Sequence, residues 1–265
     1  MLGSGSSGNA VLVECEGSRI LVDAGFGTRT LSGRLRAIGV DPRSIEACFV
    51  THEHNDHVQG AGRGAKRWGW TVYATPGTAQ APELAETRVR RFKSGASIDL
   101  DRMTVESTRT PHDAMESVGF VVTSRSTGAR AAIFYDIGHA SEAIATACRD
   151  ADILLIESNH DDDMLRHGPY PRWLQARIAS PVGHLSNRCA AQLARRVVSR
   201  QVNHLVLSHL SERCNRPYIA LKSMTEALNR SRFRGTVTAA VQDGVVGPFT
   251  PSASRAEAPL QYELL

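Results

Sequence analysis

The chain has 265 residues, of which 42% are hydrophobic and 22% are charged, and this composition excludes a disordered or collagen-like protein. A chain of this length buries roughly 75% of the surface that its unfolded form exposes, so folding requires neither disulfides nor a structural metal. The formal net charge of +4 permits a polyanionic partner without demanding one.

Membrane attachment and secretion are not expected. No apolar run approaches the roughly 20 residues that span a bilayer, and the first residues lack the basic and apolar regions of a signal peptide. The five cysteines are odd in number, scattered along the chain, and form no Cys-x-x-Cys pair. These features predict reduced thiols in a cytoplasmic protein.

Hydrophobic periodicity predicts strands and helices that alternate along the chain. The expected strands are a β-hairpin over residues 9–23, followed by strands over 45–50, 71–74, 97–110, 117–124, 130–135, 153–156, 204–208 and 236–241. The expected helices cover residues 30–38, 60–68, 76–86, 141–151, 187–198 with Ser186 as the N-cap, and 217–229.

The predicted strands fall into two batches, each followed by helices. This order is typical of an α/β protein in which two sheets pack face to face with helices outside. No break in composition interrupts residues 1–250, so we expect one domain there. Residues 251–265 carry Ser, Ala, Pro and Glu without periodicity and are expected to form a loose C-terminal tail.

A glycine-serine segment opens the chain, and residues 3–8 match the G-x-G-x-x-G pattern of dinucleotide-binding proteins. That interpretation needs a strand before the glycines and a helix after them. Only two residues precede the segment, and the residues that follow alternate like a strand. A flexible turn is one alternative. The other is a turn beside an active site, where backbone N–H groups approach a substrate phosphate.

Residues 51–57, Thr-His-Glu-His-Asn-Asp-His, are the strongest functional signal in the sequence. Four side chains that can bind metal ions lie within six positions: His52, His54, Asp56 and His57. They follow a short apolar strand, where a side-chain period of two directs His52 and His54 to the same side. Asp56 and His57 are expected in the following turn. The segment therefore predicts two half-sites for metal ions.

The pattern H-x-H-x-D-H after a strand resembles the metallo-β-lactamase superfamily, and four further motifs resemble that family in the same order along the chain. They centre on Asp23 in Leu-Val-Asp-Ala-Gly, His112 in Thr-Pro-His-Asp, Asp136 in Tyr-Asp-Ile-Gly and His209 in Leu-Ser-His-Leu. The resemblance implies an αββα sandwich. It also implies that Asp23 supports the metal-binding loop from behind.

The same resemblance implies two divalent metal ions. It assigns His52, His54 and His112 to the first ion, Asp56, His57 and His209 to the second, and Asp136 to a bridging position between them. Imidazole and carboxylate ligands suit Zn²⁺ or Mn²⁺. A full set without cysteine favours phosphoester chemistry over a lactamase-type site.

Further stretches resemble one bacterial branch of the family, the YycJ/WalJ-like hydrolases. They include residues 2–9, 156–160, 183–187 and 207–211. The branch implies a 5′→3′ exonuclease that acts on DNA and is linked to DNA repair. The alternatives left open are a small-molecule hydrolase on the same fold, such as a cyclic phosphodiesterase, thioesterase or lactamase-like enzyme, and a binding module without catalysis. Oligomeric state is not predicted.

Several residues outside the ligand set are candidates for catalysis and substrate binding. Asp56 can orient the attacking hydroxide while it binds metal. His184, just before the helix capped by Ser186, can bind phosphate or assist the leaving oxygen, or it can merely pack the loop against the helix. Contacts with substrate are expected from Ser6, Ser7, Asn9 and Asn187. The arginines at 177, 188, 195 and 196 form either a solvated face or a surface for a nucleic-acid backbone.

Overall fold

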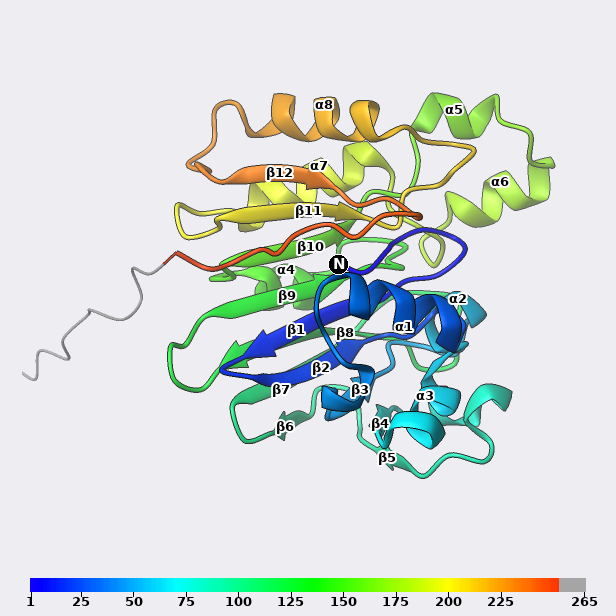
Figure 1. Ribbon diagram of the computed structural model, residues 1–265. Coiled ribbons are helices and arrows are strands. Elements are labelled where there is room, and N and C mark those ends of the chain that lie inside the picture. Colours follow the sequence, from blue (N-terminus) through cyan, green and yellow to red (C-terminus); the bar gives the residue numbers. More distant parts are fainter. Residues whose placement is uncertain (253–265) are drawn as a thin grey trace, which may run out of the picture.

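The computed structural model describes residues 1–252 and consists of two β-sheets with helices on their outer faces (Figure 1). The first sheet has the order β1-β2-β3-β4-β5, and the second has the order β12-β11-β10-β9-β8-β7-β6. The strands of the first sheet are β1 Val11–Cys15, β2 Ser18–Val22, β3 Ala47–Phe49, β4 Thr71–Ala74 and β5 Val89–Arg91. Those of the second are β6 Ser97–Asp99, β7 Met103–Arg109, β8 Val118–Ser124, β9 Arg130–Phe134, β10 Ile153–Glu157, β11 His204–Ser208 and β12 Thr236–Ala239.

Three apolar clusters divide the molecule into four layers. The middle cluster joins residues of both sheets, such as Phe49 and Phe120. A second cluster packs α4, α7 and α8 against the outer face of the larger sheet, and a third packs α1 and α3 against the smaller one. The helices are α1 Thr28–Ala37, α2 Asn55–Val58, α3 Ala61–Trp68, α4 Glu142–Cys148, α5 Asp162–Arg166, α6 Arg172–Ile178, α7 Asn187–Val197 and α8 Pro217–Leu228. The predicted α/β sandwich is confirmed.

Two predicted elements are wrong in detail. The helix expected over residues 76–86 is replaced by two single 3₁₀ turns, Thr78–Gln80 and Pro82–Leu84. Pro82 has no N–H to donate and forces the preceding Ala81 into an extended conformation, which interrupts a helix. The strand expected over residues 97–110 is an antiparallel pair, β6 and β7, because the chain turns at residues 100–102.

Several elements were not predicted from the sequence: β5, α5, α6 and the short 3₁₀ turn Pro42–Ser44. The tail predicted over residues 251–265 lies almost entirely outside the described residues. Among the helices of residues 1–252, none is both long enough and apolar enough to cross a membrane.

The parallel strands all end at the same edge of the sandwich. In the first sheet β2 and β3 are parallel, and in the second sheet β9, β10, β11 and β12 are parallel. Open α/β sheets bind ligands beyond the carboxyl ends of such strands. The residues that follow β2, β3, β9, β10 and β11 therefore occupy the place where a site is expected.

Candidate metal centre

Three candidate site residues adopt a left-handed backbone within two residues of the end of a strand. Asp23, Asp136 and His209 have φ of 61°, 52° and 54°, and they are three of the five non-glycine residues with positive φ in residues 1–252. This conformation is sparsely populated for residues with a side chain. Strain of this kind gathers at functional sites, and here it turns each side chain into the space beyond the sheet edge.

The histidine-rich loop is anchored by one buried carboxylate. Asp23 accepts hydrogen bonds from the backbone N–H of Thr51 at 2.7 Å and from its hydroxyl at 2.7 Å. Asp23 Oδ2 also lies 2.7 Å from His57 Nδ1. Because Nδ1 is held from behind, His57 presents Nε2 to the site. His57 lies in the short helix α2 rather than in a turn as predicted.

A tyrosine links this anchor to the second sheet. Tyr135 directly follows β9, and its hydroxyl donates a hydrogen bond to Asp23 Oδ2 at 2.8 Å. Burial and the charge of Asp23 raise the pKa of Tyr135 well above its usual value, so the phenol keeps its proton and remains a donor. No role was predicted for Tyr135 from the sequence, although its position beside Asp136 was a signal.

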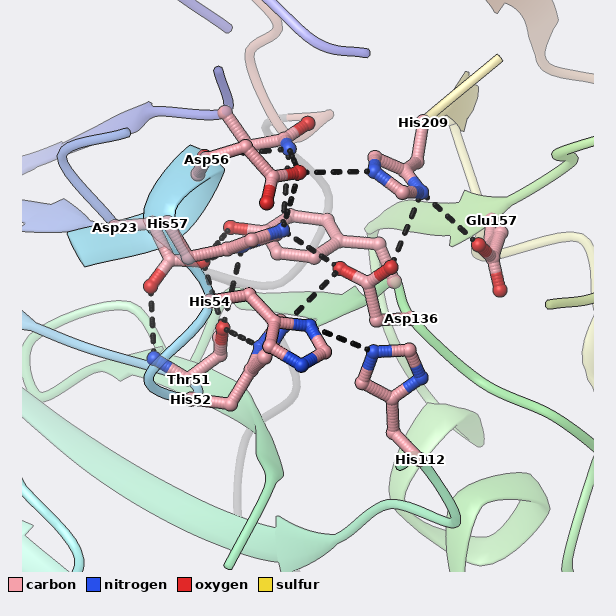
Figure 2. Close-up of polar contacts among 12 residues, drawn as sticks. Asp23, Thr51, His52, His54, Asp56, His57, His112, Asp136, Glu157 and His209 are labelled. Carbon is pink, nitrogen blue, oxygen red and sulfur yellow. Dashed lines mark hydrogen bonds and ion pairs between the residues drawn. The ribbon is translucent and has the colours of Figure 1, made fainter. Parts of the chain in front are cut away.

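The predicted metal ligands converge at the sheet edge (Figure 2). Within each of three groups, one nitrogen or oxygen atom per residue lies within 4.8 Å of the others. The groups are His52, His54 and His112; Asp56, His57 and His209; and His52, His57 and Asp136. All seven residues that the sequence singled out as ligands are therefore brought together.

Asp136 lies between the other two groups. Its Oδ2 atom is 2.8 Å from His57 Nε2 and 3.9 Å from His52 Nε2. Its Oδ1 atom is 3.1 Å from His209 Nδ1. The carboxylate thus faces both half-sites from a buried position.

The buried nitrogen of His52 tests whether metal ions fit this arrangement. His52 Nε2 is buried and makes no hydrogen bond with any residue of the described chain. A buried polar atom without a partner costs free energy. An ion held with His54 and His112 would satisfy this nitrogen, so the residues present fit a divalent metal.

The charges of the site favour cations. Burial alone would raise the pKa of Asp136, but His209 and His57 hold it well below its usual value. Burial and the neighbouring His57 lower the pKa of His52, and burial lowers that of His112. These two imidazoles are therefore neutral with a free lone pair, the form that binds metal.

Other imidazoles of the site are protonated in the absence of a metal. Burial would lower the pKa of His209, yet Asp136 and hydrogen bonds to two other carboxylates raise it to about 9. Asp56 and Asp136 likewise hold the pKa of His57 well above its usual value against the effect of burial. The carboxylates thus attract positive charge, which either protons or metal ions can supply.

Glu157 belongs to the centre, although the sequence analysis gave it no role. Its side chain is wholly buried at the end of β10. Oε1 lies 2.7 Å from His184 Nδ1 and 3.1 Å from His209 Nδ1, and Oε2 accepts the backbone N–H groups of Ile137 and Leu185. The available signal was a single acid that closes an otherwise apolar strand, Ile-Leu-Leu-Ile-Glu.

His184 faces the opening of the centre. Its Nδ1 atom is bound to Glu157, and its side chain is 21% exposed. It lines a cavity of about 260 Å³ together with Ser6, His54, Asp56 and His112. Burial would lower the pKa of His184, but Glu157 and Asp136 raise it well above its usual value.

The glycine-serine loop lies beside this cavity, and β1 rather than a helix follows it, so the dinucleotide interpretation is wrong. Ser6 and Ser7 are exposed, and Ser6 lines the cavity. Asn9 is buried instead: its carbonyl oxygen accepts from Ser4 and Gly5, and its amide nitrogen lies 3.3 Å from Asp56 Oδ2. This geometry favours a positioning role for Asn9.

Asn187 is also directed into the protein. Its Oδ1 atom accepts from the Ser158 hydroxyl at 2.6 Å and from the Asn215 amide at 2.9 Å. Ser186 caps α7 as predicted and accepts from the N–H of Cys189. Asn187 therefore fixes the start of α7 behind His184 and does not line the cavity.

Comparisons with known proteins agree with this architecture. Residues 18–210 match the model of the β-lactamase superfamily domain. The chain is 32% identical over 260 residues to exodeoxyribonuclease WalJ of Streptococcus pneumoniae, covering 95% of each chain. It is 31% identical over 238 residues to exodeoxyribonuclease YycJ of Bacillus anthracis, covering 88% of this chain and 89% of that protein.

A solved structure supports the fold alone. The metallo-β-lactamase fold protein YhfI from Bacillus subtilis superposes with a TM-score of 0.69 at 18% identity, covering 91% of this chain and 93% of that one. Fold, motif order and similarity over nearly the whole chain lead to one conclusion. The chain belongs to the metallo-β-lactamase superfamily, in the group that contains WalJ and YycJ.

Proposed function

We propose that this protein is a DNA exonuclease that uses two divalent metal ions to hydrolyse phosphodiester bonds. The observation that carries the proposal is the placement of Asp136 between two groups of metal-binding side chains. The names of the two bacterial relatives, both exodeoxyribonucleases, support DNA as the substrate. The ions are proposed to be Zn²⁺ or Mn²⁺, which imidazole and carboxylate ligands suit.

In this proposal His52, His54 and His112 hold one ion, while Asp56, His57 and His209 hold the other. Asp136 would lie between the two ions and neutralise part of their charge. Two ions at such a site activate water at neutral pH and stabilise the attacking and leaving oxygens of an in-line displacement. Support comes from the lone pair of His52 Nε2, which no described residue uses.

Asp56 is proposed to orient the attacking water. Its side chain is 24% exposed and lines the cavity, and its Oδ2 atom lies 3.2 Å from His57 Nε2 and 3.4 Å from His209 Nε2. His57 and His209 hold the pKa of Asp56 well below its usual value, although burial acts in the opposite direction. The carboxylate is therefore ionised and can accept a hydrogen bond from water.

His184 is proposed to bind the phosphate and to give a proton to the leaving oxygen. Because Glu157 holds Nδ1, the ring presents Nε2 to the cavity. Glu157 also keeps the imidazole in its protonated form, which is the form that can donate. Ser6 and Ser7, exposed on the neighbouring loop, are proposed to contact the substrate, and Asn9 and Asn187 to position the loops.

Finer features of the function are also proposed. The 5′→3′ polarity and a role in DNA repair rest on the resemblance to the WalJ and YycJ group. A cytoplasmic location is supported by the five cysteines, all of which are free thiols. One domain over residues 1–250 is supported by the cluster of apolar side chains shared by both sheets.

A substrate panel tests this function. Chelator-treated protein refilled with Mn²⁺ or Zn²⁺ is given end-labelled duplex DNA, single-stranded DNA, RNA and a cyclic nucleotide. We expect DNA to be shortened from its ends, approximately two ions per chain, and loss of activity in His54→Ala. Hydrolysis of the cyclic nucleotide alone would favour a small-molecule enzyme, and protein without metal would exclude the proposed centre.

A further inference from the structure

Helix α6, Arg172–Ile178, is unusual because none of its seven residues is buried. Its sequence nevertheless includes Trp173, Leu174 and Ile178. Helices this short are not stable on their own and normally depend on burying an apolar face. In this protein no helix or sheet of the sandwich buries the apolar side chains of α6.

The helix is held in place through polar contacts around it. Arg177 Nε lies 2.5 Å from Asp113 Oδ2, and Asp113 directly follows His112 in the metal centre. The N–H of His184 donates to the carbonyl of Ile178 at 2.8 Å. In Figure 1, α6 stands at the end of the sandwich, away from the sheets. These contacts connect α6 to two segments that carry site residues.

One side of α6 forms a wall of the catalytic cavity. Tyr170, Leu174 and Ile178 line the same cavity of about 260 Å³ as His54, Asp56, His112 and His184. Leu174 and Ile178 are four positions apart and share a helix face. The cavity thus has a polar wall of metal-binding side chains and another wall with apolar and aromatic side chains. We call Tyr170, Leu174 and Ile178, together with the exposed Trp173 that precedes Leu174, the α6 wall.

Trp173 is the exposed member of the α6 wall. Its side chain is 67% exposed, and it lies one position before Leu174 and four before Arg177. The Arg177 side chain is 54% exposed. Trp173 and Arg177 are four positions apart and share a helix face. An exposed aromatic ring and a guanidinium group on one face are the combination on which single-stranded nucleic acids stack their bases.

We propose that the α6 wall binds the unpaired bases at the end of a nucleic-acid strand while the scissile phosphate lies at the metal centre. This inference rests on the proposed function. A phosphodiester at the polar wall places the attached nucleosides against the remaining walls. An unpaired base exposes both of its faces for stacking, whereas a base in the terminal pair of a duplex exposes only the outer face. The site therefore takes a single-stranded or frayed end rather than an intact duplex end.

Binding to an uncleavable strand tests the proposal. The probe is a phosphorothioate DNA octamer labelled at its far end, compared with the same strand carrying abasic positions in its last three nucleotides. Fluorescence anisotropy with Mn²⁺-loaded protein gives both dissociation constants. We expect the wild-type protein to bind the base-bearing strand about tenfold more tightly, since stacking on one aromatic side chain contributes on this scale.

Variants separate stacking from general binding. In Trp173→Ala/Leu174→Ala we expect affinity for the base-bearing strand to fall about tenfold and affinity for the abasic strand to stay at the wild-type level. Trp173→Phe should restore most of the loss caused by Trp173→Ala. Tyr218→Ala is the matched control, because Tyr218 is 69% exposed on α8 and does not line the cavity, and it should bind both strands like wild type.

Two outcomes would overturn the α6 wall: equal wild-type affinity for the two strands, or an equal loss on both strands in the double variant. Hydrolysis of an ordinary oligonucleotide by the same wild-type preparation is scored separately. Cleavage with equal affinities would reject the α6 wall and leave the exonuclease intact. Preference for the base-bearing strand without cleavage would reject the exonuclease and leave the α6 wall supported.

Discussion

Two halves of the metal centre are built in different ways. The motif half comprises residues 51–57, which supply four side chains from one loop held by Asp23. The strand-end half comprises Asp136, Glu157 and His209, one residue from the end of each of three adjacent parallel strands. The first half depends on local sequence, whereas the second exists only once β9, β10 and β11 pair in register.

In each half, one buried carboxylate hydrogen-bonds to ring nitrogens of histidines and fixes the orientation of those rings. Asp23 is wholly buried and holds His57, and Glu157 is wholly buried and holds His184 and His209. Carboxylates behind a metal-binding histidine fix its orientation and raise its basicity. The difference lies in what else they hold: Asp23 secures a loop, while Glu157 connects a ligand to the candidate proton donor.

The largest effect is expected where the halves meet. Asp136→Asn removes the negative charge that faces both half-sites, so we expect activity to fall by more than about 100-fold, beyond the 10–100-fold typical of residues behind the ligands. Metal content, measured by mass spectrometry of refilled protein, should fall below two ions per chain. Two retained ions with full activity would contradict a bridging role.

The second-largest effect is expected for Asp23→Asn, which should lower the metal affinity of the motif half. The amide cannot accept from Thr51, Tyr135 and His57 together, so we expect a 10–100-fold loss in metal affinity. Stability to urea should fall by about 1–3 kcal/mol, because buried donors lose their acceptor. The control is Asp152→Asn, a buried acid at the opposite end of β10. It should lose stability without losing metal, and equal metal loss in both variants would argue against a specific anchor.

In the strand-end half, Glu157→Gln should change the pH dependence of the reaction. The Glu157 carboxylate raises the pKa of His184, so a neutral glutamine should lower it. If protonated His184 donates to the leaving oxygen, the rate falls as pH rises through this pKa. The descending limb of the kcat/KM profile should therefore move to lower pH, with a loss of about tenfold at neutral pH. An unmoved limb would remove His184 from the proton transfer.

The same contrast explains what could be predicted from the sequence. The motif half was visible because His52, His54, Asp56 and His57 lie within six positions. The strand-end half was visible only for the residues whose surroundings resemble a known family. The local signal of Glu157 is only that it closes an apolar strand. Its role depends on the pairing of β10 with β11, which places it beside Ser208 and next to His209.

The fold shows the same limit. Alternating and apolar strands were found because their periodicity is a local property, and Ser186 caps α7 as expected. Helix α6 was missed because Leu174 and Ile178 face a cavity and Trp173 faces solvent, so the helix has no apolar face in the core. Asn9 and Asn187 were expected to contact substrate because they lie beside site motifs, but burial of a polar side chain depends on tertiary contacts that sequence order does not reveal.

The smallest expected effect compares two serine caps. Ser186→Ala and Ser141→Ala each remove a hydroxyl that accepts from a backbone N–H in the first turn of a helix. Each should therefore lower the free energy of unfolding by about 1 kcal/mol in urea titrations. Only Ser186 lies two residues after His184, so its loss should also loosen the proton donor and lower kcat by a few-fold, whereas Ser141→Ala should leave kcat unchanged. An equal kcat in the two variants would mean that Glu157 alone fixes His184 and that the start of α7 contributes only stability.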